Sequence, residues 1–190
     1  MGDNLSMNRR RFIKYGITGA IILTAGQYGL EPLSRFSQKL KSIFKTYQAH
    51  QEEWKLLSIE DSIVLTPIIE RFLDSIPESP DGFKPDMGDF LTELDQICYT
   101  LPEYIKNDLK SLLKIMHFPL SRKIFFGIPS PWELTPPSDI ETALEKWEFS
   151  DSKILNLTYA SLKNLIFFTW YGGNRSWSTM GYPGPPKLFY

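Results

Sequence analysis

The sequence predicts an all-α fold, an irregular bundle of about five to six helices joined by proline-rich loops. Three observations predict it. Apolar residues recur at spacings of three and four in several segments, which is the period of an amphipathic helix. No alternation of apolar and polar residues persists beyond four residues, so no strand is predicted. Hydrophobic residues make up 42% of the 190 residues, which is enough to build a core and excludes a disordered chain.

Two helices are predicted in the first part of the chain. An amphipathic helix is expected over 33–47, followed by a polar connector. A second helix is expected after the N-cap Ser58, because Glu60 and Asp61 stand in its first turn, where the helix dipole favours acids. Pro67 is expected to kink this helix or to set its start.

The later helices are expected over 90–98, after Pro102, and after a capping box formed by Ser138 and Glu141. The last helix, over 154–170 and capped by Asp151 and Ser152, is apolar nearly all round. We therefore predict that it is the central, buried helix of the bundle. From residue 171 an extended tail rich in aromatic residues, Gly and Pro follows.

Residues 1–27 have the layout of an export signal, with basic residues before an apolar run of roughly 11 residues, short of the ~20 that span a membrane. Five residues place this segment in register with a twin-arginine (Tat) signal, which it resembles: Arg9, Arg10, Phe12, Ile13 and Lys14. The alternative is a basic patch before a membrane-surface helix. A Tat signal predicts a periplasmic protein that engages the Tat translocase, with the signal either cleaved or kept as an inner-membrane anchor.

The predicted organisation has three parts: the signal or anchor at 1–27, the amphipathic helix and connector at 28–56, and a helical domain at 57–190. The first part holds four basic side chains and one acidic one, so the remaining residues carry a net charge near −4 against −1 for the whole chain. This balance predicts no nucleic-acid binding and gives no reason to expect binding to anionic lipid.

The sequence predicts no catalytic, cofactor-binding or metal site. One cysteine excludes an internal disulfide, and two histidines leave little for a metal cage. Cys98 is expected to be a small buried hydrophobe. Trp147 and Trp170 are explained by core filling rather than by a stacking platform. His117 is either a haem ligand or, as we favour, a partly buried or capping residue after a helix. Three carboxylates share a helix face and are expected to be solvated rather than to bind a metal: Glu141, Glu145 and Glu148.

The tail is the candidate partner interface, because its large rings need a surface to bury against. That surface is either the chain's own bundle or a partner protein, whose contacts Trp and Tyr commonly anchor. Gly181 and Gly184 are expected to matter with either surface if they hold positive φ, which Ala would resist. The candidate interface residues are Trp170, Tyr171, Trp177, Gly181, Tyr182, Pro183, Gly184 and Pro185.

Two sets of motifs stand behind the Tat-like signal. The first set comprises Leu57-Ser-Ile-Glu60, Ile68-Ile69, Ile76-Pro77 before a Pro/Gly loop, and Phe90-Leu91. The second set comprises Trp147-x-x-Ser150, Tyr159-x-x-Leu162-Lys163, Trp170-Tyr171 and Trp177-x-x-Met180-Gly-Tyr-Pro-Gly-Pro185. Together they cover residues 57–186 and resemble the small subunit 3 family of gluconate 2-dehydrogenase, in which a Tat signal is placed likewise.

The resemblance implies a non-catalytic accessory subunit of a membrane-associated FAD dehydrogenase of the glucose–methanol–choline (GMC) type. The FAD is expected on the large partner subunit, which crosses the membrane bound to the small one and passes electrons to a cytochrome c or quinone. Two alternatives stay open. One is a stand-alone, membrane-tethered structural or adaptor domain of the periplasm, and the other is an enzyme or haem protein in its own right.

Overall fold

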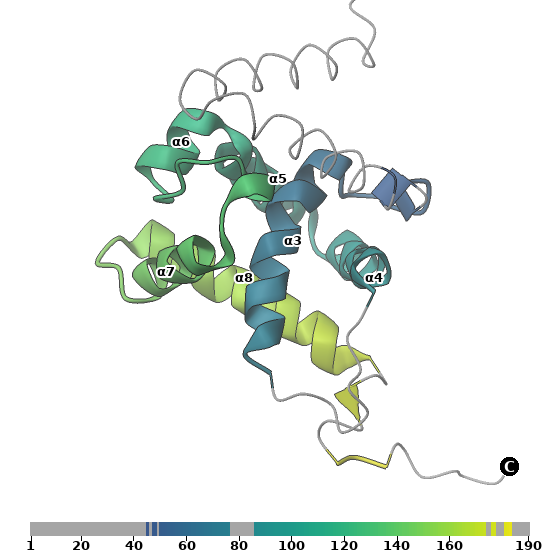
Figure 1. The fold of residues 1–190 in the computed structure, drawn as a ribbon. Helices are drawn as coiled ribbons and strands as arrows, with labels where there is room; N and C mark the ends of the chain where they lie inside the picture. The colour runs from purple at the N-terminus through teal and green to yellow at the C-terminus, as the bar shows by residue number, and fades with distance from the viewer. Residues whose placement is uncertain are drawn as a thin grey trace, which may run out of the picture. The chain divides into compact units, whose positions relative to one another are not determined.

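The computed structural model describes residues 45, 47–48, 50–76, 86–173, 176–177 and 181–183 of the chain. These residues belong to one compact unit, residues 43–190. They form six α-helices and one 3-10 turn without any strand (Figure 1), so the predicted all-α fold is confirmed. The elements are α3 (Ile59–Asp74), α4 (Met87–Thr100), α5 (Glu103–His117), α6 (Pro119–Ile124), the 3-10 turn η1 (Trp132–Leu134), α7 (Pro137–Glu148) and α8 (Lys153–Gly172).

The central helix of the bundle is α3. It contacts α5, α7, α8 and η1, and Figure 1 shows it crossing the middle of the fold. Four consecutive inward residues of α3 are fully buried: Val64, Leu65, Ile68 and Ile69. The prediction that the last helix is central and buried is therefore wrong. α8 packs against α3, α4 and α7 on one side and leaves its other side open.

The start of α3 follows the predicted capping pattern. The Ser58 hydroxyl accepts the Asp61 N–H at 3.3 Å, and the Asp61 carboxylate accepts the Ser58 N–H at 2.8 Å, which forms a reciprocal capping box. Lys110 from α5 pairs with the same carboxylate at 2.5 Å, so the cap also joins α5 to α3. Pro67 lies inside α3 and neither starts nor ends it.

A buried carboxylate fixes the segment that leads into α3. Asp95 on α4 is fully buried and accepts the backbone N–H groups of Lys55, Leu56 and Leu57 at 2.7, 2.9 and 2.6 Å. Charged acceptors make the stronger hydrogen bonds in proteins. This single side chain therefore ties the backbone of 55–57 to α4.

The start of α7 differs from its prediction, whereas α8 has a predicted N-cap residue but lacks a capping hydrogen bond. The N-cap of α7 is Pro136, Pro137 occupies its first turn, and no side chain caps it. The predicted capping box at Ser138 and Glu141 is therefore wrong, because the two prolines begin the helix earlier with their preset φ. Ser152 is the N-cap of α8 as predicted, but its side chain makes no capping hydrogen bond.

Two buried tryptophans connect η1 and α7 to the rest of the bundle. Trp132 Nε1 donates to the Met116 carbonyl at 2.9 Å, and Trp147 Nε1 donates to the Phe126 carbonyl at 3.0 Å. The Trp147 and Phe126 rings also meet edge to face, with centroids 5.2 Å apart. Trp147 is a core residue, as the sequence predicted.

Most of the predicted helix 33–47 lies outside the described residues, within which Lys45, Tyr47 and Gln48 are helical. Tyr47 is hydrogen-bonded to Thr66 at 3.0 Å, and Trp54 Nε1 donates to Thr92 at 3.0 Å. The residues before position 57 thus pack on α3 and α4. None of the described helices combines the length and hydropathy that a membrane-spanning helix requires.

Candidate functional site

The open side of α8 carries a continuous exposed stripe. Its six residues follow the spacing 3-4-3-4-3 along the helix, and all are solvent-exposed. We call this stripe the α8 seam; it consists of Ile154, Leu157, Ser161, Asn164, Phe168 and Tyr171. Its four large apolar members are between 41% and 74% exposed.

The spacing of the α8 seam is that of the a and d positions through which helices pair in coiled coils. No member of the seam is charged, although Lys153 and Lys163 stand elsewhere on α8. Solvated helix faces usually carry charges, whereas exposed and contiguous apolar side chains mark sites of interaction. Ser161 and Asn164 in the middle of the seam are residues of the kind that fix the register of a helix pair.

Apart from Tyr171, the residues of the seam were not predicted to form an interface, although their spacing of three and four can be recognised in the sequence. α8 also carries an inward stripe, formed by Thr158, Leu162, Ile166 and Thr169. The two stripes together make the helix apolar nearly all round, which concealed the fact that only one of them faces the bundle.

Two candidate interface residues at the end of α8 have different surroundings. Tyr171 is exposed and is the last member of the seam. Trp170 is only 4% exposed, so its assignment to the interface is corrected to the core, because a buried ring cannot reach a partner. The Trp170 indole N–H is buried without a hydrogen-bond partner.

The described part of the tail is anchored to the end of α8. The buried Ser176 hydroxyl donates to the Gly173 carbonyl at 3.0 Å, next to the last turn of the helix. The Trp177 and Tyr182 rings meet edge to face at 5.5 Å, and the Tyr182 N–H donates to the Trp177 carbonyl at 2.8 Å. Gly181 between them has a positive φ of 66°, which Ala would resist.

These contacts make a small aromatic turn that leaves Tyr182 and Pro183 exposed. Gly184 and Pro185 lie outside the described residues, as do all five residues of the Tat-like motif: Arg9, Arg10, Phe12, Ile13 and Lys14.

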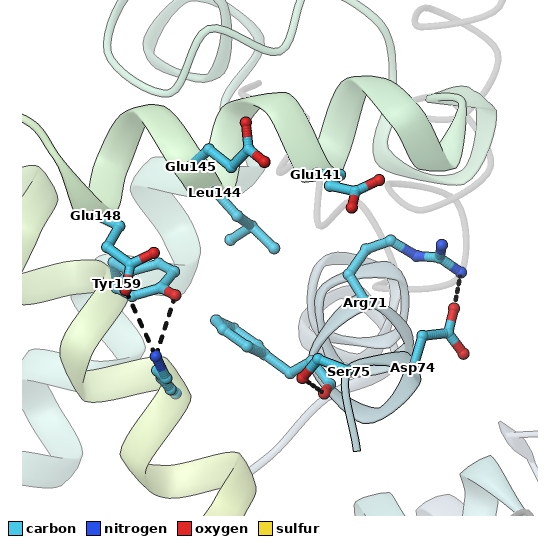
Figure 2. Close-up of a pocket in the computed structure, with 10 residues that line it drawn as sticks. Arg71, Asp74, Ser75, Glu141, Leu144, Glu145, Glu148 and Tyr159 are labelled. Atoms are coloured by element: carbon cyan, nitrogen blue, oxygen red, sulfur yellow. Dashed lines mark hydrogen bonds and ion pairs between the residues drawn. The ribbon is translucent and has the colours of Figure 1, made fainter. Parts of the chain in front are cut away.

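A pocket of about 330 Å³ opens between α3, α7 and α8 (Figure 2). Phe72, Leu144 and Tyr159 supply its apolar surface. Arg71 pairs with Asp74 at 2.6 Å, and Lys163 contacts Glu148 at 3.5 Å and Tyr159 Oη at 3.3 Å. The hydrogen bond to Tyr159 raises the pKa of Lys163, and burial raises the pKa of Tyr159, so this pair is an ammonium and a neutral phenol at pH 7.

The charges of this pocket disfavour a nucleotide cofactor. Four carboxylates line the pocket against the two cations. One is Asp74, and the other three are the acids predicted to share a helix face: Glu141, Glu145 and Glu148. Carboxylates repel phosphate groups, and the acids that are exposed on α7 keep their contact with water. The pocket therefore presents a solvated acidic surface rather than a phosphate cradle.

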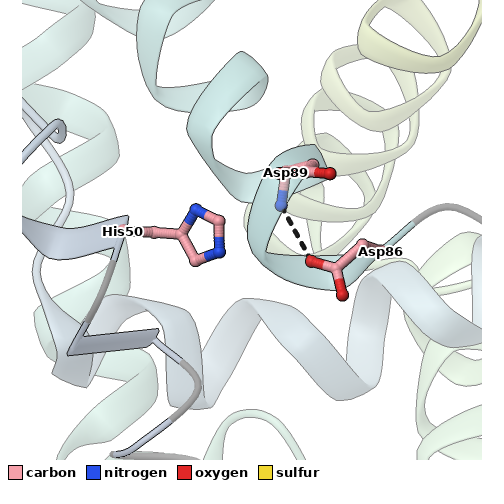
Figure 3. A group of neighbouring side chains, drawn as sticks. All are labelled: His50, Asp86 and Asp89. Carbon is pink, nitrogen blue, oxygen red and sulfur yellow. Dashed lines mark hydrogen bonds between the residues drawn. The ribbon is translucent and has the colours of Figure 1, made fainter.

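His50, Asp86 and Asp89 form a second cluster, at the N-terminus of α4 (Figure 3). One ligand-type atom from each lies within 4.8 Å of the others, which is a spacing that a metal ion could use. Asp86 Oδ1, however, already accepts the N–H groups of Gly88 and Asp89 at 2.8 and 3.2 Å. The helix dipole also opposes a cation at this end. We assign Asp86 to capping of α4.

Cys98 and His117 differ in how their burial agrees with the sequence predictions. Cys98 is fully buried on α4, as predicted. His117, predicted to be partly buried or capping, is instead exposed at the end of α5.

No protein-family model, curated protein or solved structure matches the chain.

Proposed function

We propose that this chain is the non-catalytic small subunit and Tat export escort of a FAD-dependent GMC-type oxidoreductase. The enzyme acts in the periplasm or at the membrane, and this chain stabilises its flavoprotein subunit. The α8 seam is the observation that carries the proposal, because an uncharged apolar helix face with a/d spacing fits a partner helix. The Tat-like motif and the subunit 3 motifs supply the direction of export and the class of partner.

The seam and the tail form one surface in this proposal. Tyr171 ends the seam, and the Trp177–Tyr182 turn follows it. Aromatic anchors surrounded by smaller contacts are typical of binding hot spots. The large subunit brings the FAD and the chemistry, and a cytochrome c subunit is a further candidate partner. This chain contributes a surface.

Co-purification from the native cell tests the proposal. The full chain carries a tag at its C-terminus, and the captured material is examined for a second polypeptide and for flavin absorbance. We expect a large flavoprotein in a fixed ratio to this chain. Replacing Leu157 and Phe168 by Glu places two charges on the seam and should abolish capture, because an unpaired charge buried in an interface is strongly unfavourable.

The matched control is Tyr104→Glu on α5, a large side chain that is as exposed as Leu157 and lies off the seam. This variant should retain the flavoprotein. Capture of no partner by the wild-type chain would favour the stand-alone adaptor instead. A flavin or Soret band that stays with the chain after it is separated from all other polypeptides would show that it binds its own cofactor.

A further inference from the structure

A second exposed apolar surface lies on the last turn of α5 and on α6. Five large side chains, each 49% to 64% exposed, stand within eleven consecutive residues. We call them the α5–α6 surface; they are Ile115, Phe118, Leu120, Ile124 and Phe125. Figure 1 shows α6, which carries most of this surface, at the upper left, whereas α8 ends at the lower right.

The exposed charges of this segment have one sign. No acid occurs in the sequence between Asp108 and Glu133, although the whole chain has a net charge of −1. Lys114 and Lys123 are exposed within the segment. Lys110 is paired with Asp61, and Arg122 is buried within reach of the charge of Glu133, so neither adds to the exposed charge.

From this juxtaposition we propose that the α5–α6 surface binds an anionic lipid surface. Leu, Ile and Phe flanked by Lys are the side chains that insert at the boundary between headgroups and acyl chains while ammonium groups meet the phosphates. A binding site for another protein would need no single sign of charge. The net acidity of the chain gave no reason to expect lipid binding, but it averages over acids that are absent from this segment of the sequence.

The test uses the full-length chain with a probe placed on the surface itself. Cys98 is buried, so Leu120→Cys provides one reactive thiol for an environment-sensitive fluorophore. Vesicles of equal parts phosphatidylcholine and phosphatidylglycerol should shift its emission to the blue, and vesicles of phosphatidylcholine alone should not. A label at Leu157→Cys on the α8 seam, which is similarly exposed, should respond to neither. The local probe separates this surface from the basic N-terminal segment.

Charge variants measure the electrostatic part. Lys114→Gln with Lys123→Gln should weaken binding of the labelled chain to the anionic vesicles about 30-fold, since each Lys near such a surface contributes about a fivefold factor. Lys146→Gln, an exposed lysine on α7, is the matched control and should change nothing.

Three results would overturn the proposal. They are an unshifted label at position 120, an equal shift at position 157, and a shift without lipid that grows with protein concentration, which would indicate a second copy on this surface. The inference does not rest on the proposed function. Failure of the vesicle test leaves flavoprotein capture through the α8 seam unaffected.

Discussion

Among the single residues, Cys98 shows most directly what burial does to chemistry. Its side chain is fully buried on α4, and burial together with the charge of Asp95 raises the pKa of the thiol to about 12. The thiolate, which is the reactive form, is therefore absent at neutral pH. The fold contains no thiol that can be oxidised or alkylated without opening.

This pKa predicts how stability changes in alkali. The unfolded chain loses the Cys98 proton near pH 9, whereas the folded chain keeps it until about pH 12. The contribution of the Cys98 thiol to the free energy of unfolding is therefore fully present below pH 9 and is lost as the pH rises toward 12. The free energy of unfolding should fall with pH more steeply than in Cys98→Ala, by up to about 1.4 kcal/mol per pH unit. Urea unfolding over roughly pH 9 to 11 measures both slopes, and equal slopes would contradict the assignment.

The sequence predicted individual residues well where one property decided their place. Cys98 and Trp147 are buried as expected, because a thiol and a large ring on apolar helix faces gain most from leaving water. Trp170 was assigned to the interface from its position beside the tail, but the helical phase turns it inward and turns Tyr171 outward. The hydrogen bonds of the Asp95 carboxylate were not predicted, because its three backbone partners lie about 40 positions away along the chain.

For whole elements, the two serine N-caps of α3 and α8 offer a matched comparison. Ser58 makes a complete capping box, whereas the Ser152 side chain makes no capping hydrogen bond. Ser58→Ala should therefore destabilise the fold by about 1 kcal/mol, and Ser152→Ala should change stability by only a few tenths. Urea midpoints at constant slope give both values. A similar loss for both serines would show that the α3 box contributes nothing beyond the α8 cap.

Helix predictions from the sequence succeeded where a helix had both a start signal and several turns. α3, α4 and α5 have both. α6 was not predicted, because its six residues are too few to show a period. The burial of α8 could not be predicted, since one apolar helix can face a core on one side and a partner on the other. The sequence thus predicted the tail as part of the candidate site, whereas most of the seam could be recognised only from the exposed side of α8 in the structure.

Considered as a whole molecule, the chain joins a Tat-like motif to a fold without disulfides. A protein of this kind needs no oxidising compartment to fold, which suits a route that carries folded cargo. Replacing Arg9 and Arg10 together by Lys keeps the charge and removes the planar guanidinium groups.

We expect this double variant to accumulate in the cytoplasm together with the flavoprotein partner that we propose. Cell fractionation and immunodetection of both polypeptides measure the result. Arg11→Lys is the control, because it is the same substitution at the neighbouring position, which is not among the five motif residues. Normal periplasmic amounts of both polypeptides in the double variant would contradict Tat export.

The open face of α8 also limits how the chain can exist alone. A row of apolar side chains that are up to 74% exposed promotes self-association and recognition by chaperones and proteases while it is uncovered. Copies made in excess of their partner would be removed faster than copies in the complex. The abundance of this chain in the cell would then follow the supply of the large subunit rather than its own rate of synthesis.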